Sequence, residues 1–226
     1  MRLQKISFGD SWQSDGWELS LLPKSMVPQI AMDENLAVTL AIGDVLDTLK
    51  VRWFLGGSLA SSVHGIPRAT LDADIVADLR ASHVGSFLRA LGEDWYVEEN
   101  SVWQAITERG CFNLIHFETA MKIDVLVPKL RRFDGGQFSR AKRTAVSEGS
   151  VIEIPVCSAE DIVLAKLEWY RAGGELSERQ WGDIIGVLKV SASRLDLDCM
   201  RDGAAELAVL DLLAKALIAA GVHSGN

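Results

Sequence analysis

The sequence lacks the features that define several common classes of protein. Only three of its 226 residues are cysteines, scattered and without CxxC spacing, so neither a disulfide framework nor a zinc site is indicated. The four histidines show no metal-ligand spacing. A net charge of −8 argues against the basic surface that a general nucleic-acid binder needs. No GxGxxG turn follows a strand pattern, which excludes a dinucleotide-binding fold.

Long apolar runs are also missing. Residues 1–13 do not contain the apolar core of a signal peptide, and the most apolar tail segment, 207–220, is interrupted by Asp211 and Lys215. We therefore expect a soluble, cytoplasmic protein with no membrane partner. The remaining composition, 48% hydrophobic and 24% charged, is that of an ordinary globular protein, and the chain is long enough to bury a core.

The chain is organised around residues 52–76. Residues 53–55 are a short apolar run that predicts a strand, and Gly56, Gly57 and Ser58 follow it directly. The small residues after Ser58 predict a tightly packed helix. Two glycines allow the backbone to approach a ligand closely, and a helix start offers free N–H groups and the positive end of its dipole. This turn is therefore a candidate phosphate-binding site.

A second strand then carries two acidic residues. Side chains alternate along a strand, so Asp72 and Asp74 point to the same face, and a later strand over 121–127 places Asp124 on one face with Lys122. Three carboxylates brought together would repel one another unless a cation lay between them. Divalent Mg²⁺ or Mn²⁺ binds such oxygen ligands and would hold a phosphate against them. The alternative is that Asp72 or Asp74 lies at a solvated strand end and that Asp124 pairs with Lys122.

The chain divides into an N-terminal arm (1–30), an α/β (α+β) core (31–156) and a helical C-terminal subdomain (157–226). The expected fold is a mixed sheet flanked by helices, with the helical part closing over a nucleotide cleft. Strand signals predict a hairpin over 112–127 and a strand pair over 144–156. Helical periodicity predicts helices over 33–49 (capped by Asp33), over 82–91, after Ser158, and over 177–190 and 196–220.

The basic segment 129–143 has two interpretations. Gly135 and Gly136 predict a loop or a helix broken by a loop. Its lysines and arginines would grip a triphosphate or an RNA acceptor, or would simply be solvated in a crossover. Because only Phe133 and Phe138 are available for stacking, the second interpretation is favoured.

Taken in order, these residues resemble the nucleotidyltransferase superfold of DNA polymerase β, and within it the minimal nucleotidyltransferases that include the AbiEii-type toxins. In that group a strand leads to a Gly-Gly/Ser helix start, an acidic pair follows, and a third acid lies on a later strand. The resemblance covers residues 31–190 and is strongest over 52–76. The matching positions are Gly56, Gly57, Ser58, the Arg-Ala-Thr at 68–70, Asp72, Asp74, Asp124 and the apolar-then-Lys helix at 161–167.

The resemblance implies a function. Asp72, Asp74 and Asp124 would hold Mg²⁺ (or Mn²⁺), and Asp124 would help to deprotonate the acceptor. The resemblance further implies that a nucleoside triphosphate (NTP) is the substrate, and that a nucleoside monophosphate passes to a hydroxyl of RNA, protein or a small molecule. By analogy with toxin-like relatives, tRNA or a partner protein would be the acceptor, in a toxin–antitoxin role. Gly56, Gly57, Ser58, Arg68 and Lys166 would bind the nucleotide.

Some assignments remain open at this level. Lys166 is either a nucleotide contact or a solvated helix residue, and Arg68 either clamps phosphate or caps the turn after Pro67. The toxin-like group carries a later helix with two acids three residues apart, whereas this chain supplies only Asp183, which would then pair with Arg179 one turn away.

Two rival functions are weighed against the transferase. A serine hydrolase would use Ser58, Asp124 and His223. However, Ala60 stands where the nucleophile motif requires glycine, and Asp72 and Asp74 would have no role in the reaction. The stronger rival is a protein of the same fold that binds a nucleotide or a partner without turnover, because fold does not settle function.

Overall fold

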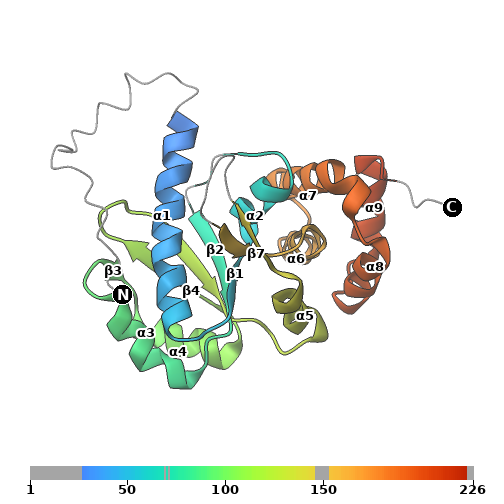
Figure 1. Ribbon diagram of the computed structural model, residues 1–226. Coiled ribbons are helices and arrows are strands. Elements are labelled where there is room, and N and C mark those ends of the chain that lie inside the picture. The colour runs from blue at the N-terminus through green and yellow to red at the C-terminus, as the bar shows by residue number, and fades with distance from the viewer. Residues whose placement is uncertain (1–26, 69, 71, 146–152, 223–226) are drawn as a thin grey trace.

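The computed structural model describes residues 27–68, 70, 72–145 and 153–222, with side chains from Leu36 onward (Figure 1). In this part of the chain one mixed seven-stranded sheet has the order β3-β4-β5-β2-β1-β7-β6. Its strands are β1 (Trp53–Leu55), β2 (Asp72–Ala77), β3 (Trp95–Tyr96), β4 (Cys111–His116), β5 (Lys122–Leu126), β6 (Lys142–Ala145) and β7 (Glu153–Val156). The predicted fold class is confirmed.

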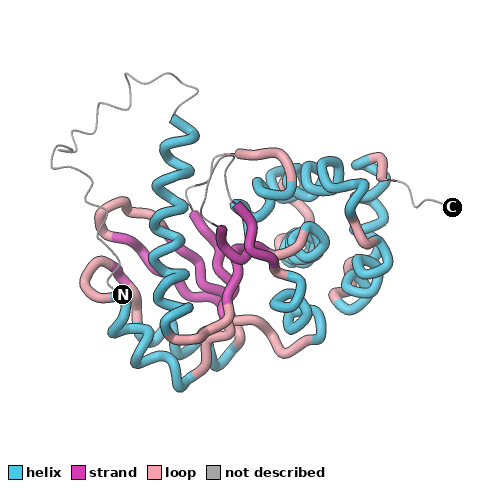
Figure 2. The backbone as a smooth tube through the Cα atoms, in the orientation of Figure 1, coloured by secondary structure: helices cyan, strands magenta, loops and turns pink. Residues whose placement is uncertain are grey.

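The C-terminal helices gather on one side of this sheet, and the earlier helices pack nearer to its strands (Figure 2). They are α1 (Val27–Thr48), α2 (Gly57–His64), α3 (Val84–Leu91), α4 (Glu99–Glu108), α5 (Arg132–Arg140), α6 (Ala159–Ala172), α7 (Glu178–Ser191), α8 (Leu197–Glu206) and α9 (Leu210–Ala220). Every described element after β7 is helical, as the sequence predicts for the C-terminal part. No described helix is both long and apolar enough to span a bilayer.

Central strand pairing determines which residues share a face. β2 runs parallel to β5 and antiparallel to β1, and β4 pairs antiparallel with β5, which confirms the predicted hairpin. Alternation then buries Ala73, Ile75 and Ile123 on one face. The acids of β2 and β5 lie on the opposite face, which is half-buried.

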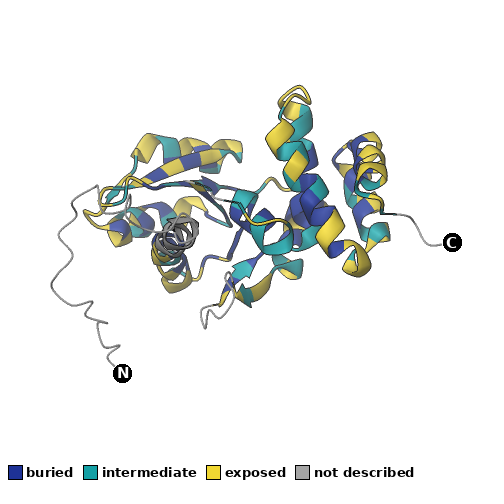
Figure 3. Cartoon of the chain, turned by 90° about the horizontal axis from the view of Figure 1, so that it is seen from above, coloured by how far each residue is buried: buried dark blue, intermediate teal, exposed yellow. Residues whose placement is uncertain are grey.

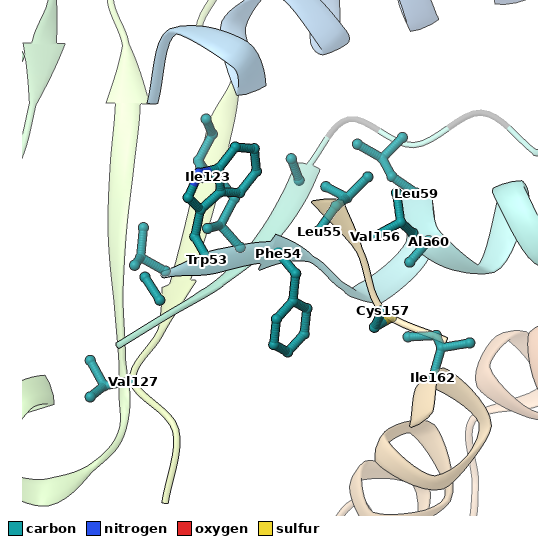
Figure 4. Packing of buried hydrophobic residues seen from close by; sticks show 14 of the residues in the cluster. Trp53, Phe54, Leu55, Leu59, Ala60, Ile123, Val127, Val156, Cys157 and Ile162 are labelled. Atoms are coloured by element: carbon teal, nitrogen blue, oxygen red, sulfur yellow. The ribbon is translucent and has the colours of Figure 1, made fainter. Parts of the chain in front are cut away.

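The apolar face of the sheet packs against α1, α3 and α4 (Figure 1). Gly43 on α1 makes room for the Trp53 ring, because a Cβ at that position would overlap the indole. The indole Nε1 donates a hydrogen bond of 2.8 Å to Asp47. Figure 4 shows Trp53 and Phe54 projecting to opposite sides of β1, so that neighbouring residues serve the two layers of the core. Buried residues concentrate along the sheet and the inner sides of the helices (Figure 3).

Three local predictions are wrong. The first helix begins at Val27, inside the predicted arm, so Asp33 is an interior residue and not its cap; the rest of the arm, 1–26, lies outside the described residues. Segment 129–143 contains a continuous helix, α5, across both glycines. The predicted helix over 196–220 is two helices, because a turn at Leu207–Val209 buries Leu207 and Val209 and folds α9 back.

Side-chain pairing explains why α5 forms despite its two glycines. Arg131, at its N-cap, donates to Asp134 at 2.7 Å and to Glu168 at 2.6 Å. Arg140, at its last turn, pairs with the fully buried Asp161 at 2.7 Å. Contacts at both ends hold the helix against α6, and this offsets the helix-breaking tendency of glycine. Two arginines of the basic segment therefore have structural partners.

Candidate functional site

The turn after β1 brings backbone N–H groups next to a carboxylate. Gly57 has a φ of +54°, a left-handed conformation that glycine adopts without strain. A Cβ on Gly57 would overlap the carboxyl group of Asp74. The Ser58 N–H donates to Asp74 Oδ2 at 3.4 Å, and the Gly56 N–H donates to the Asp74 carbonyl at 2.8 Å. Glycine at position 57 therefore permits α2 to begin directly against the acidic strand.

Two carboxylates lie side by side across the parallel strands. Asp74 on β2 is in register with Asp124 on β5, and Asp72 is in register with Lys122. Burial, together with the negative charge of Asp124, raises the pKa of Asp74. Among the described residues, the Oδ1 atom of Asp124 is buried and has no hydrogen-bond partner. A buried lone pair of this kind suits a cation or a proton donor supplied from outside the chain.

Lys122 brings a positive charge close to Asp124 and Asp72. Its Nζ donates to Asp124 Oδ2 at 2.9 Å and lies 3.9 Å from Asp72 Oδ2. The hydrogen bond to Asp124 raises the pKa of Lys122. Asp72 is half exposed. The predicted alternative is thus partly correct, since Asp124 does pair with Lys122, but both remain on the half-buried face beside Asp74.

A second charged cluster lies on the helical side. Asp183 accepts hydrogen bonds from Arg68 Nε at 2.7 Å and from Lys166 Nζ at 2.9 Å. Arg68 Nη2 also donates to Ser58 Oγ at 2.6 Å. Burial alone would raise the pKa of Asp183, but the hydrogen bonds from Arg68 and Lys166 outweigh burial and lower it. The prediction that Asp183 pairs with Arg179 is wrong, because its partners are Arg68 and Lys166.

This cluster shows the surroundings of the two basic residues whose roles the sequence left open. Lys166 is buried, with its side chain 9% exposed, so it is not a solvated helix residue. Arg68 does more than cap a turn, because it joins Ser58, in the turn after β1, to Asp183 on α7. The sequence missed Asp183 as the residue that connects them, since its partners are 17 and 115 residues away along the chain.

One cavity of about 510 Å³ brings the predicted site residues together. The carboxylate strands and the Gly-Ser turn line one side, and α6 and α7 line the other. Also on its wall are Cys111, Gln137 and Trp169, which sequence reasoning did not select. The predicted residues on this cavity are Gly56, Gly57, Ser58, Arg68, Asp72, Asp74, Asp124 and Lys166. His223, needed by the hydrolase alternative, lies outside the described residues.

The donor set fits a hard divalent cation. Within the described ranges, no three His, Cys, Asp or Glu side chains are already placed to hold a metal ion together. Mg²⁺, however, usually takes one or two carboxylates and completes its shell with water and substrate phosphate oxygens. Asp74, Asp124 and the unpartnered Asp124 Oδ1 provide that kind of oxygen ligand.

Solved structures share this fold at low sequence identity. The structure of ANT(2'')-Ia in complex with adenylyl-2''-tobramycin matches with a TM-score of 0.50 and 10% identity, over 76% of this chain and 95% of that chain. An antigenic nucleotidyltransferase-like protein from Paracoccidioides brasiliensis matches with a TM-score of 0.50 and 16% identity, over 83% of this chain and 92% of that chain. No protein-family model and no curated protein sequence matches. The chain has a minimal nucleotidyltransferase fold.

Proposed function

We propose that this protein transfers a nucleoside monophosphate from an NTP to an acceptor hydroxyl and releases pyrophosphate. The observation that carries the proposal is the cavity of about 510 Å³, which paired carboxylates, a glycine turn and a cationic cluster line together. Each group corresponds to one requirement of the reaction, since the turn and the cations suit phosphates and the carboxylates suit a divalent cation.

The triphosphate would lie between α2 and the helical part. Backbone N–H groups at the start of α2, with the helix dipole, favour negative charge at that point. Ser58 Oγ is already hydrogen-bonded to Arg68, and Lys166 approaches from α6. Asp183 holds both cations in place, so the phosphates would meet preorganised positive charge.

The transfer itself needs one bond to form and one to break. The acceptor oxygen attacks the α-phosphorus, and the bond from that phosphorus to the bridging oxygen of the β-phosphate breaks, so that pyrophosphate leaves with the electron pair. The acceptor hydroxyl loses its proton to a neighbouring carboxylate. Asp124 is the candidate because its Oδ1 is buried within the site and, among the described residues, accepts no hydrogen bond.

Asp72, Asp74 and Asp124 would hold Mg²⁺ or Mn²⁺. When bound, the ion would neutralise triphosphate charge and lower the barrier to attack. Burial of Asp74 next to Asp124 is costly in the absence of a counter-charge, and this cost is the physical reason to expect a divalent ion at that position.

The test offers each labelled NTP, with Mg²⁺, to a whole-cell extract that contains RNA, protein and small molecules. We expect label to pass to one fraction and pyrophosphate to be released. Asp74→Asn should reduce transfer at least ~100-fold while the protein stays folded, because a metal ligand is lost. Asp44→Asn, at an exposed position on α1, is the matched control and should transfer normally.

NTP affinity, measured beside label transfer, distinguishes the transferase from a protein that binds nucleotide without turnover. A protein that only binds nucleotide would show NTP affinity without label transfer, and its affinity would not change in Asp74→Asn. A toxin-like role would appear as growth arrest on expression, relieved by Asp74→Asn and not by Asp44→Asn. Transfer by Asp74→Asn at the rate of the unaltered protein would reject the proposed function.

A further inference from the structure

A second cavity, of about 340 Å³, adjoins the first. The two share part of their lining, including Val76 on β2 and Leu126 on β5. These are the next residues on the same strand face after Asp74 and Asp124, because side chains alternate. The second cavity therefore lies next to the Asp74–Asp124 pair, on the side away from Asp72. Its volume is in the range of small-molecule binding sites.

The carboxylates of this second cavity are already neutralised. Arg131 donates to Asp134 Oδ2 at 2.7 Å and to Glu168 Oε1 at 2.6 Å. Lys129 also reaches Glu168 Oε1, at 3.3 Å. A cationic ligand would have to compete with these charge-assisted hydrogen bonds, which are among the stronger polar contacts in proteins.

Positive charge remains in the lining of this cavity. Three cationic side chains, Arg109, Lys129 and Arg131, stand against two carboxylates, Asp134 and Glu168, which leaves one net positive charge in a chain that carries −8 overall. Within the described residues no carboxylate pairs with Arg109, whose guanidinium makes a long contact of 3.5 Å with the Pro128 carbonyl. Its remaining donors suit an anionic group on a ligand.

The junction between the cavities is aromatic. Trp169 on α6 lines both of them and is 56% exposed, although most of the tryptophan surface is apolar. An exposed indole next to apolar side chains offers a flat surface for an aromatic or other planar group. Val127, Phe133 and Ala165 add apolar surface to the wall of the second cavity.

We infer that this second cavity is the acceptor subsite and that it takes a small hydroxyl compound with a flat apolar body and an anionic group. This inference rests on the proposed function, with the NTP in the first cavity. An acceptor in the second cavity lies past Val76 and Leu126, so its hydroxyl reaches Asp124 from the side opposite the triphosphate corner. The net positive charge of the lining opposes a polycationic acceptor.

The test measures binding and does not require turnover. The probe is anilinonaphthalene sulfonate, a flat apolar anion, titrated by fluorescence into the full chain with ATP and Mg²⁺ present. Gly110 lines the second cavity, and an ideal Cβ there would meet no heavy atom within 4 Å, so Gly110→Phe should occupy part of the cavity without a backbone clash. Gly135→Phe on α5 is the matched control. An ideal Cβ at Gly135 also meets no heavy atom within 4 Å, and Gly135 lines neither cavity.

We expect one dye to bind per chain, with affinity reduced at least ~10-fold in Gly110→Phe because the space is filled. Arg109→Gln should reduce affinity by ~5-fold through loss of one charge. Gly135→Phe should bind normally. Any of four results would overturn the inference: no dye binding to the unaltered chain, equal affinity in Gly110→Phe, displacement of the dye by ATP, or equally tight binding of a cationic dye of similar size.

Measurements of turnover test the acceptor subsite and the proposed function separately. Once the labelled acceptor is known, Gly110→Phe should raise the KM for the acceptor and leave the KM for the NTP unchanged. Dye binding as described, with no label transfer by the unaltered protein, would reject the transferase function and leave the second cavity as a binding site for a flat apolar anion. Label transfer with unchanged acceptor KM in Gly110→Phe would reject the subsite alone.

Discussion

Lys122 places its ammonium group 2.9 Å from Asp124 Oδ2 and within 3.9 Å of Asp72 Oδ2. The chain thus supplies its own positive charge to two of the three acids proposed to bind a metal ion. Two unit charges about 4 Å apart interact by roughly 1 kcal/mol in water and roughly 4 kcal/mol at an effective dielectric constant of 20. Lys122 must therefore oppose any divalent cation that enters.

Removal of this charge should strengthen metal binding. Lys122→Gln is expected to bind Mn²⁺ ~10-fold more tightly than the unaltered protein, because the repulsion between ammonium and metal is gone. Paramagnetic resonance of free Mn²⁺ measures the affinity without nucleotide or turnover. Lys189→Gln, at an exposed position on α7, is the control and should leave the affinity unchanged. Equal or weaker binding by Lys122→Gln would contradict this account.

The ionised Asp74 carboxylate should lower the free energy of unfolding at neutral pH. Its folded-state pKa is raised by burial and by Asp124, so the ionised carboxylate destabilises the fold above that pKa, and the cost disappears as pH falls through it. Asp74→Asn should therefore melt at a higher temperature than the unaltered protein at pH 7, in the absence of metal. The difference should shrink on acidification, as calorimetry at several pH values can check. A lower melting temperature for the variant at pH 7 would count against the carboxylate repulsion.

Asp183 should behave in the opposite way. Its folded-state pKa is lowered, so it contributes stability above the unfolded value of about 3.9, and this stability is lost as pH falls through the lowered folded pKa. Asp183→Asn leaves Lys166 and Arg68 without their carboxylate, and breaking a buried pair costs about 3–5 kcal/mol. Urea unfolding at pH 7 should show the loss, and the difference between the two proteins should begin to shrink only below about pH 4, as the pH falls toward the lowered pKa of Asp183.

The control for this experiment is Asp198→Asn. Asp198 pairs with Arg201 at 2.6 Å, but its side chain is 93% exposed, so we expect almost no change in the free energy of unfolding. Equal effects of the two substitutions would mean that the Asp183 cluster is no more than a surface contact.

Gly57→Ala should abolish NTP binding. The new methyl group would overlap the Asp74 carboxylate, and alanine is strained at a φ of +54°. Calorimetric titration with NTP and Mg²⁺ measures the loss. Gly135→Ala is the opposite case, because that glycine lies within α5 in open space, so the substitution should stabilise the helix by roughly 0.5–1 kcal/mol. Normal NTP affinity in Gly57→Ala would exclude this turn as the phosphate site.

Arg140→Gln tests the structural role of the basic segment. Asp161 is fully buried, and loss of its arginine would leave a buried carboxylate unpaired, at a cost of about 3–5 kcal/mol. Denaturant unfolding should show this loss, whereas Arg201→Gln at an exposed helix pair should have little effect. A change in NTP affinity without loss of stability would instead assign Arg140 to the nucleotide.

Several site features were open to prediction because they depend on local geometry. Alternation along a strand is enough to place Asp72 and Asp74 on one face, and the glycine pair is enough to predict a turn that approaches a ligand. Errors arose where tertiary contacts override local preference. Glycines at 135 and 136 predict a loop, but ion pairs at both ends of α5 hold a helix there.

The amino-acid sequence by itself determined the fold class, the two-acid strand and the glycine turn, because strand alternation and backbone freedom act over a few residues. Only the tertiary structure decided that Asp74 lies in register with Asp124, and that Lys122 neutralises one side of that pair. Only the folded chain shows that Asp183 accepts hydrogen bonds from both Arg68 and Lys166, although Arg68 is 115 residues away from Asp183 in the sequence. Such contacts depend on how strands and helices pack, and short-range patterns carry no information about partners that distant.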